Sequence, residues 1–215
     1  MRPSRLLEAY RLYLAEGNTA AFLRQLVQWY SEATLQRLVD SGDCYSRRAA
    51  ALALGLMGTD ASIPILGAAL SASDRKLRMV ADDALRSIAA RQGSAMHRQA
   101  LESVVRLNEC GSFRQADSLA TAVIGEHGAT AELFYQRSLA RFNLDRLRAA
   151  QDDCLRVLAR HRFHYQAMVA LGHCYLQLGD LVEALFWMRR AIEVYPDLEH
   201  VRIQAKRLER TILGK

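Results

Sequence analysis

The sequence has few of the residues that interrupt helices. Only 12 glycines and 3 prolines occur among its 215 residues, and these two residue types are the least favourable in a helix interior. Alanine, leucine and arginine, which favour helices, are frequent instead, and β-branched residues are few. Because 51% of the residues are hydrophobic, an intrinsically disordered chain is excluded. The composition therefore predicts an all-α fold.

Long apolar runs and cysteine motifs are also missing. No stretch reaches the about 18 consecutive apolar residues that indicate a transmembrane helix. The N-terminal segment MRPSRLLEAYRLYLAEGN has charges every few residues, unlike the apolar core of a signal peptide. The four cysteines show no CxxC spacing, which argues against a metal-binding or disulfide framework. We expect a soluble, cytoplasmic protein with free thiols and no membrane span.

The charge pattern lacks a concentrated basic segment. The net charge of +6 is spread over both halves of the chain, without the long run of like charges that indicates a nucleic-acid-binding arm. Nearly all basic residues are arginines, which suit ion pairs with the interleaved acidic residues. We therefore predict a mixed, solvated surface and do not expect a nucleic-acid partner.

Catalytic motifs are missing as well. No HExxH, GxSxG, P-loop or GxGxxG pattern occurs. The adjacent pairs Asp82-Asp83 and Asp152-Asp153 point about 100° apart on a helix, so they are interpreted as solvated acids paired with nearby arginines. His161 and His164 supply only two metal ligands from one segment, which is too few for a zinc site. We predict that the protein is not an enzyme and binds neither cofactor nor metal.

The chain does contain a regular spacing of 34 residues. Three alanines follow it: Ala116, Ala150 and Ala184. A turn-forming residue stands five positions before each of them: Gly111, Asp145 and Gly179. A period of this length is typical of stacked helix–turn–helix repeats. We expect about 13 helices in an α-solenoid of antiparallel helix pairs.

A second spacing, of 31 residues, governs the N-terminal part. The segments YSRRAAALALGLMG and KLRMVADDALRSIA align at this offset, which places Arg47 on Arg78 and Asp43 on Asp74. With the intervening GTDASIPILGAAL, the pattern resembles HEAT repeats over residues 43–90. Residues 18–42 fit as a degenerate leading repeat, and residues 1–17 as a cap. The small alanines would let helices approach closely when repeats stack.

The last 34-residue unit, LGHCYLQLGDLVEALFWMRRAIEVYP, resembles a tetratricopeptide repeat (TPR). The residues that carry the resemblance are Met168, Leu171, Gly172, Tyr175, Ala184, Met188 and Pro196. The two preceding units are degenerate, with Ser138 and Val104 at the position of the glycine. The resemblance implies a right-handed solenoid with HEAT-like repeats in 1–92, three TPRs in 93–198 and a capping helix in 199–215. The basic outer face of that last helix leaves a membrane or an acidic partner open as an alternative role.

The TPR resemblance implies a groove lined by the first helix of each repeat. The residues placed there are Leu101, Val105, Asn108, Tyr135, Gln136, Leu139, Phe142, Asn143, Val169, His173, Leu176 and Gln177. The positions at which the family clamps a carboxylate read Leu101, Val105, Gln136, Gln166 and Ala170, so binding of a chaperone tail is not expected. Tyr135 and Phe142 are predicted to be exposed anchors, whereas Trp29 and Trp187 are predicted to lie in the core.

These observations predict a non-enzymatic adaptor or scaffold that presents a TPR groove to a peptide, helix or protein partner, with a HEAT surface as a second candidate. One alternative is that the chain itself or a second copy fills the groove. Two others follow from the HEAT resemblance: a nucleic-acid-binding protein, and an accessory protein similar to bilin lyases. The sequence contains no feature that names the partner.

Overall fold

The structure, a computed structural model, describes residues 4–127 and 129–214. These residues form thirteen α-helices and one 3-10 turn, and no strand. The chain divides after Ile88 into two compact units, which are described separately. The predicted all-α fold is confirmed.

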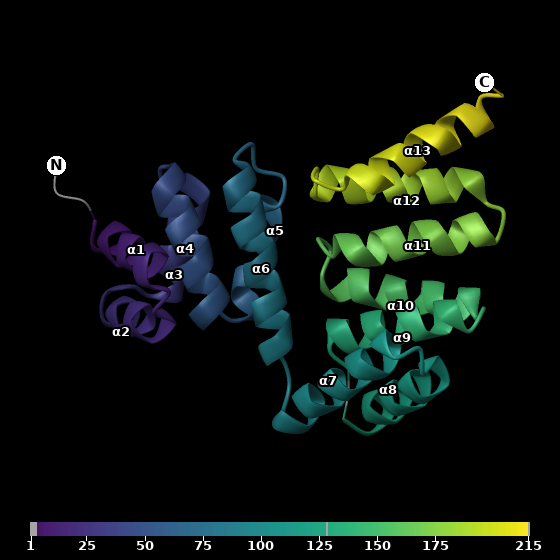
Figure 1. Ribbon diagram of the computed structural model, residues 1–215, viewed down its shortest axis with the longest axis horizontal. Helices are drawn as coiled ribbons and strands as arrows, with labels where there is room; N and C mark the ends of the chain where they lie inside the picture. The colour runs from purple at the N-terminus through teal and green to yellow at the C-terminus, as the bar shows by residue number, and fades with distance from the viewer. Residues whose placement is uncertain (1–3, 128, 215) are drawn as a thin grey trace. The chain divides into compact units, whose positions relative to one another are not determined.

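The first unit begins with the helices α1 and α2 and continues as helix pairs (Figure 1). Its elements are α1 (Arg5–Glu16), α2 (Thr19–Trp29), α3 (Glu32–Ser41), α4 (Cys44–Met57), the 3-10 turn η1 (Asp60–Ser62), α5 (Ile63–Ala69) and α6 (Arg75–Arg91). The side chains of Ser4, Asn18 and Ser31 accept N-cap hydrogen bonds at the first three helices, which satisfies backbone donors that the helix leaves free. At η1 the side chain of Thr59 accepts the cap hydrogen bond from the Ala61 amide.

The 31-residue offset reappears as a repeated hydrogen-bonding device. Arg47 Nε donates to the carbonyl oxygen of Val39 at 2.7 Å, and Arg78 Nη1 donates to that of Ala72 at 2.8 Å. In each case the guanidinium satisfies a backbone carbonyl at or just after the end of the preceding helix, where intrahelical donors run out. The recurring arginine is therefore part of how each repeat joins the next.

Small residues bring α4 and α6 into close contact. A Cβ atom at Gly55 would lie only 2.8 Å from the Cα and Cβ atoms of Ala84, and Ala84 is itself 3% exposed. Side chains of any size at these positions would separate the two helices. The aligned alanines of the first unit thus have the packing role that the sequence predicts.

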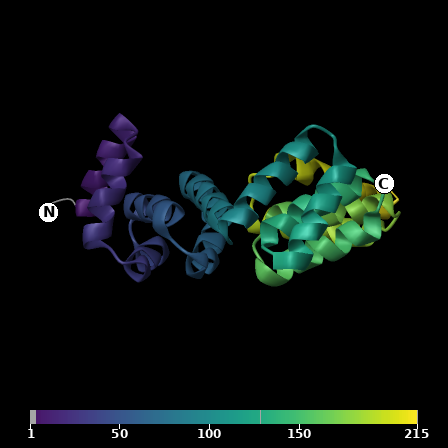
Figure 2. The same cartoon turned by 90° about the horizontal axis from the view of Figure 1, so that it is seen from below.

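The second unit contains seven helices, and each packs against the next along the chain (Figures 1 and 2). They are α7 (Ala95–Glu109), α8 (Phe113–His127), α9 (Ala131–Asn143), α10 (Leu147–Arg160), α11 (Tyr165–Gln177), α12 (Leu181–Val194) and α13 (Glu199–Ile212). Short turns join the pairs α7–α8, α9–α10 and α11–α12, so the helices of each pair run antiparallel.

The 34-residue spacing is built into these turns. The residue at the turn has a left-handed backbone in all three pairs, with φ of 72° at Gly111, 59° at Asp145 and 83° at Gly179. In each turn an amide donates to the carbonyl oxygen five residues earlier: Ser112 to Leu107, Arg146 to Arg141, and Asp180 to Tyr175, at 2.8–2.9 Å. This bond and the left-handed residue define the Schellman helix ending. The three turns therefore have one geometry.

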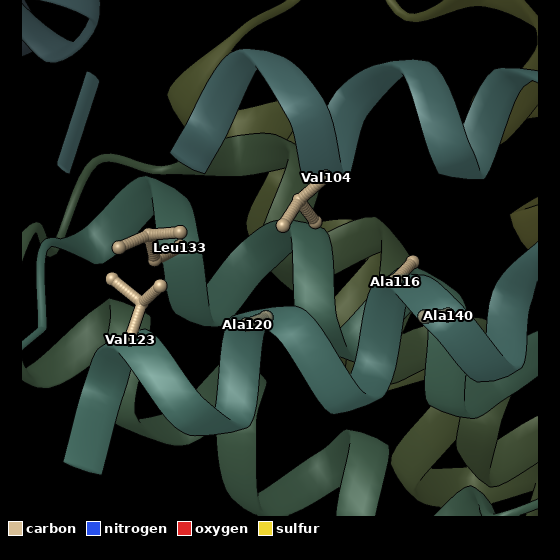
Figure 3. Close-up of a cluster of buried hydrophobic side chains, with 6 residues drawn as sticks. All are labelled: Val104, Ala116, Ala120, Val123, Leu133 and Ala140. Carbon is tan, nitrogen blue, oxygen red and sulfur yellow. The ribbon is translucent and has the colours of Figure 1, made fainter. Parts of the chain in front are cut away.

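The repeated alanines lie in the core of the second unit. Ala116, Ala150 and Ala184 are each 0% exposed. Figure 3 shows the cluster around the first of them, in which side chains of α7, α8 and α9 meet. Its buried members are Val104, Ala116, Ala120, Val123, Leu133 and Ala140. Because the alanines are small, the helix backbones come close enough for the larger residues beside them to interdigitate.

A network of buried charges lies beside this core, which corrects one prediction. Asp153 is 0% exposed and not solvated. Both its oxygens accept hydrogen bonds from Arg137 at 2.7 and 2.8 Å, and Arg141 adds a third bond at 2.8 Å. Arg141 also donates to Asp117, which in turn accepts from Arg146. These bonds join charged side chains of α8, α9 and α10 and of the turn before α10. Each of these desolvated ions therefore has a partner of opposite charge.

Other side chains also differ from the predictions. Asp82 is buried and bonded to Arg86 at 2.6 Å rather than solvated. Trp29, which the sequence predicts to lie in the core, is 57% exposed. Cys154 and Cys174 are buried free thiols, and burial raises their pKa values to about 12 and about 11. These thiols are protonated and unreactive at neutral pH.

Candidate protein-binding face

The residues predicted to line a groove lie on the first helices of the three 34-residue pairs, α7, α9 and α11. Helix α7 packs against α9, and α9 packs against α11, so these helices form one continuous surface of the second unit. We call it the A-helix face and define it by the twelve predicted residues, Leu101, Val105, Asn108, Tyr135, Gln136, Leu139, Phe142, Asn143, Val169, His173, Leu176 and Gln177. The same helices also contribute their other sides to the core.

None of these twelve residues is buried. Asn143 and Gln177 are exposed, and the other ten are half-buried. Tyr135 and Phe142, which the sequence predicts to be exposed anchors, are thus half-buried. Tyr135 packs against the buried cluster that contains Phe134, so only part of its ring is available to a partner. The face is a partly covered apolar surface rather than a row of protruding side chains.

Amide side chains connect α7 to α9 on this face. The Nδ2 atom of Asn108 donates to the backbone oxygen of Gln136 at 2.9 Å and to its Oε1 at 3.1 Å. Gln136 in turn donates to Glu132 at 2.9 Å. The Oδ1 atom of Asn108 is buried without a hydrogen-bond partner. The amide of Asn108 therefore ties α7 to α9, and its buried Oδ1 is not accessible to a partner.

The row of contacts continues from α9 through α11 to α13. The rings of Phe142 and His173 are 6.5 Å apart between centroids, and His173 Nε2 lies 3.2 Å from Gln204 Oε1 on α13. Sequence reasoning misses Gln204, because the TPR motif ends before α13. The signal that could have found Gln204 is an amide residue on the helix that follows the last repeat. Helix α13 therefore contacts the face as well as packing against α12.

A histidine and a glutamate border the face near Tyr135. His164 Nδ1 accepts from the backbone amide of Ala167 at 3.2 Å, so its proton is on Nε2, which faces Glu132 at 3.6 Å. Burial raises the pKa of Glu132, but the hydrogen bonds from His164 and Gln136 outweigh it and hold that pKa below its usual value. The ring of Tyr135 lies 4.8 Å from that of His164. Glu132 is therefore a carboxylate whose acceptor oxygens are already used within the protein.

The A-helix face itself has no charged side chain, since its twelve residues include no Asp, Glu, Lys or Arg. The five carboxylate-clamp positions are also uncharged, so the face has no cation for a terminal carboxylate. Among residues 4–127 and 129–214, no cluster of His, Cys, Asp and Glu is arranged to hold a metal ion. The chemistry of this surface consists of apolar contact, aromatic contact and amide hydrogen bonds.

Two family profiles match the chain. The profile of HEAT repeats matches residues 31–120, and that of the tetratricopeptide repeat matches residues 165–198. The chain carries HEAT repeats and a tetratricopeptide repeat. Both predicted families are confirmed. The tetratricopeptide match covers α11 and α12, whereas the HEAT match extends across α7 and into α8, where the sequence analysis predicts the first of three TPRs.

No curated protein matches the chain. Among solved structures, the crystal structure of a thermophilic TPR protein from Thermus thermophilus is similar, with 21% identity and a TM-score of 0.41 over 95% of this chain and 96% of that one. The fold described above rests on the helices and their spacing and not on this similarity. In the described part of the chain no helix has the length and hydrophobicity needed to span a membrane. HEAT and tetratricopeptide repeat proteins generally mediate protein–protein interaction and are typically not enzymes.

Proposed function

We propose that the protein is a non-enzymatic adaptor that holds a partner protein on the A-helix face. The observation that carries the proposal is that the twelve residues of this face, which cross α7, α9 and α11, are all uncharged and that ten of them are half-buried. Interface centres are depleted in charge and enriched in aromatic residues in the same way. Free thiols throughout the described residues fit a reducing compartment, which supports a cytoplasmic location.

The chemistry of the face selects the kind of partner. Apolar side chains such as Leu139 and Val169 alternate with the amides of Asn143 and Gln177. Amides form hydrogen bonds to backbone groups or uncharged polar groups, and the apolar residues take up apolar side chains. The partner is therefore a helix or an extended peptide that presents apolar side chains, and not a highly charged segment.

A pair of identical substitutions tests the location of the binding surface. Phe142→Glu puts a charge on the A-helix face, whereas Phe186→Glu puts the same charge on α12, where Phe186 is 54% exposed. We expect the first change to lower capture of partner proteins from source-cell extract at least ~10-fold, as loss of an interface anchor does. The second should leave capture unchanged, and both variants should keep the wild-type far-UV circular dichroism. Equal capture by the wild type and the Phe142 variant would contradict the proposal.

A further inference from the structure

The first unit has a pocket of its own, which is separate from the A-helix face. A cavity of about 300 Å³ lies between α1 and α2. Its apolar wall contains Leu12, Leu26 and Trp29, and its polar residues are Arg5, Glu8 and Gln25. This volume is at the lower end of ligand-binding pockets, so it suits a molecule of about the size of one amino acid.

The arginine and the glutamate of this pocket are held apart. Arg5 and Glu8 are one helical turn apart, a spacing at which Arg190 and Glu193 form an ion pair of 2.8 Å in the second unit. The guanidinium of Arg5 instead lies over the ring of Trp29, 3.6 Å from its centroid. Among the residues that the structure describes, neither Arg5 nor Glu8 has a hydrogen bond or ion pair through its side chain. Two exposed opposite charges therefore border one cavity, and within the described residues neither is neutralised by an ion pair.

The apolar part of the pocket is equally accessible. Trp29 is 57% exposed and Leu12 is 50% exposed, whereas Leu26 forms a buried floor at 1%. The hydroxyl of Tyr30 accepts a hydrogen bond from the Leu6 amide at 3.1 Å, which fixes the end of α2 against α1. The aromatic wall of the cavity is thus tied to α1 by a hydrogen bond next to Trp29.

We propose that this pocket binds a small zwitterion with an apolar body, namely a free α-amino acid with an apolar side chain. The carboxylate pairs with Arg5, whose planar guanidinium suits bidentate binding and is oriented by Trp29. The ammonium group pairs with Glu8, and the side chain lies against Trp29 and Leu12. The carbonyl and amide groups of Gln25 are available to either charged end. The net charge of zero over Arg5 and Glu8 favours a ligand that carries both signs over a purely anionic one.

Titration with L-leucine tests the proposal. The reporter is Trp29 emission in the full chain with Trp187→Phe, which removes the second of the two tryptophans. We expect a saturable change with L-leucine. N-acetyl-L-leucine lacks the ammonium group and L-leucinamide lacks the carboxylate, so each should bind about tenfold more weakly, as expected from the loss of one charge-assisted contact. Broadening of the leucine methyl signals in proton NMR spectra with the wild-type chain provides a second measurement that does not depend on Trp187→Phe.

Two variants and a matched control complete the experiment. Arg5→Gln and Glu8→Gln should each weaken L-leucine binding about tenfold, whereas Arg11→Gln, an exposed change on the same helix outside the pocket, should leave it unchanged. The proposal is overturned if neither measurement shows saturable binding, if the two leucine derivatives bind as tightly as L-leucine, or if Arg5→Gln has no effect. None of these results depends on the A-helix face, because Arg5, Glu8 and Arg11 lie in the first unit and Trp187, on α12, is not one of the twelve residues of that face.

Discussion

The helix pairs α9–α10 and α11–α12 share a turn geometry and a fully buried alanine, but the positions around that alanine are filled differently. Where the first pair has the buried ion pair of Arg137 and Asp153, the second has Leu171 and Trp187 at the same places in the 34-residue register. Leu171 is 0% exposed and packs with Trp187 in an apolar cluster. The same backbone therefore accepts either a fully paired ionic contact or an apolar one.

The two pairs also differ in the residues at the close contact between their helices, and a change on one helix is again compensated on the other. In α11–α12, Gly172 faces Met188, and a Cβ atom on the glycine would lie 2.9 Å from Met188 Cγ. In α9–α10 the corresponding residues are Ser138 and Cys154, which are also buried. A larger residue on one helix is matched by a smaller one on the other. The repeat register thus constrains the summed volume of the two side chains and not the identity of either.

Breaking the ionic contact should have the largest effect. Asp153→Ala leaves Arg137 buried without its bidentate partner, and removal of one member of a buried pair typically costs ~3–5 kcal/mol of unfolding free energy. Chemical denaturation monitored by circular dichroism measures this loss. Asp152→Ala, one residue earlier and exposed, should change the stability by less than ~0.5 kcal/mol. The double variant Arg137→Met with Asp153→Leu should be more stable than Asp153→Ala alone. If Asp153→Ala were as mild as Asp152→Ala, the buried network would have no structural role.

Adding a methyl group at Gly172, where α11 and α12 come close together, should have an intermediate effect on stability. Gly172→Ala forces Met188 to move, which costs ~1–3 kcal/mol as overpacking and is offset in part by the ~1 kcal/mol that alanine gains in a helix. We expect a net loss of about 1 kcal/mol in thermal or chemical unfolding. Gly125→Ala on α8 is the control, because a Cβ atom there would meet nothing within 4 Å, and it should stabilise the protein. A loss of stability in both variants would argue against the close approach at Gly172.

Exchanging the turn residues should have the smallest effect. Asp145 is the non-glycine residue with positive φ in the described chain, and glycine adopts this conformation without the steric cost of a side chain. Asp145→Gly should therefore raise the unfolding free energy by about 0.5–1 kcal/mol. The reverse change, Gly179→Asp in the next repeat, should lower it by a similar amount. Shifts in the same direction for both variants would show that the two turns are not equivalent.

The features that the sequence predicts well are those that recur. Ala184 and Gly179 repeat at a fixed spacing, so their roles as a core residue and a turn residue follow from the period alone. The pairing of Arg137 with Asp153 does not recur, and it depends on two helices that come together only in the folded unit. An acidic residue on a helix with many arginines gives no sign of being buried, so the prediction of a solvated Asp153 is wrong.

The candidate site was predictable to a similar extent. The family register places Asn143 and Gln177 on the A-helix face because they occupy equivalent places in successive repeats. It gives no information on how deeply an aromatic ring sits, and Tyr135 is half-buried because a neighbouring cluster covers part of it. Gln204 lies beyond the last repeat and was outside the pattern. The exposure of Trp29 was missed for the same reason, because an aromatic residue in a helical pattern does not show by itself whether it is covered.

Site-specific photocrosslinking tests the central claim, that the A-helix face binds a partner, most directly. The photoreactive residue p-benzoylphenylalanine would replace Asn143 or Gln177, both exposed on the face, and in a control it would replace Leu155, which is 44% exposed on α10. After irradiation in the source cells, we expect the first two positions to crosslink to the same partner protein and Leu155 to give no such product. Crosslinks from Asn143 and Gln177 only to a second copy of the chain, or the same products from Leu155, would contradict the claim.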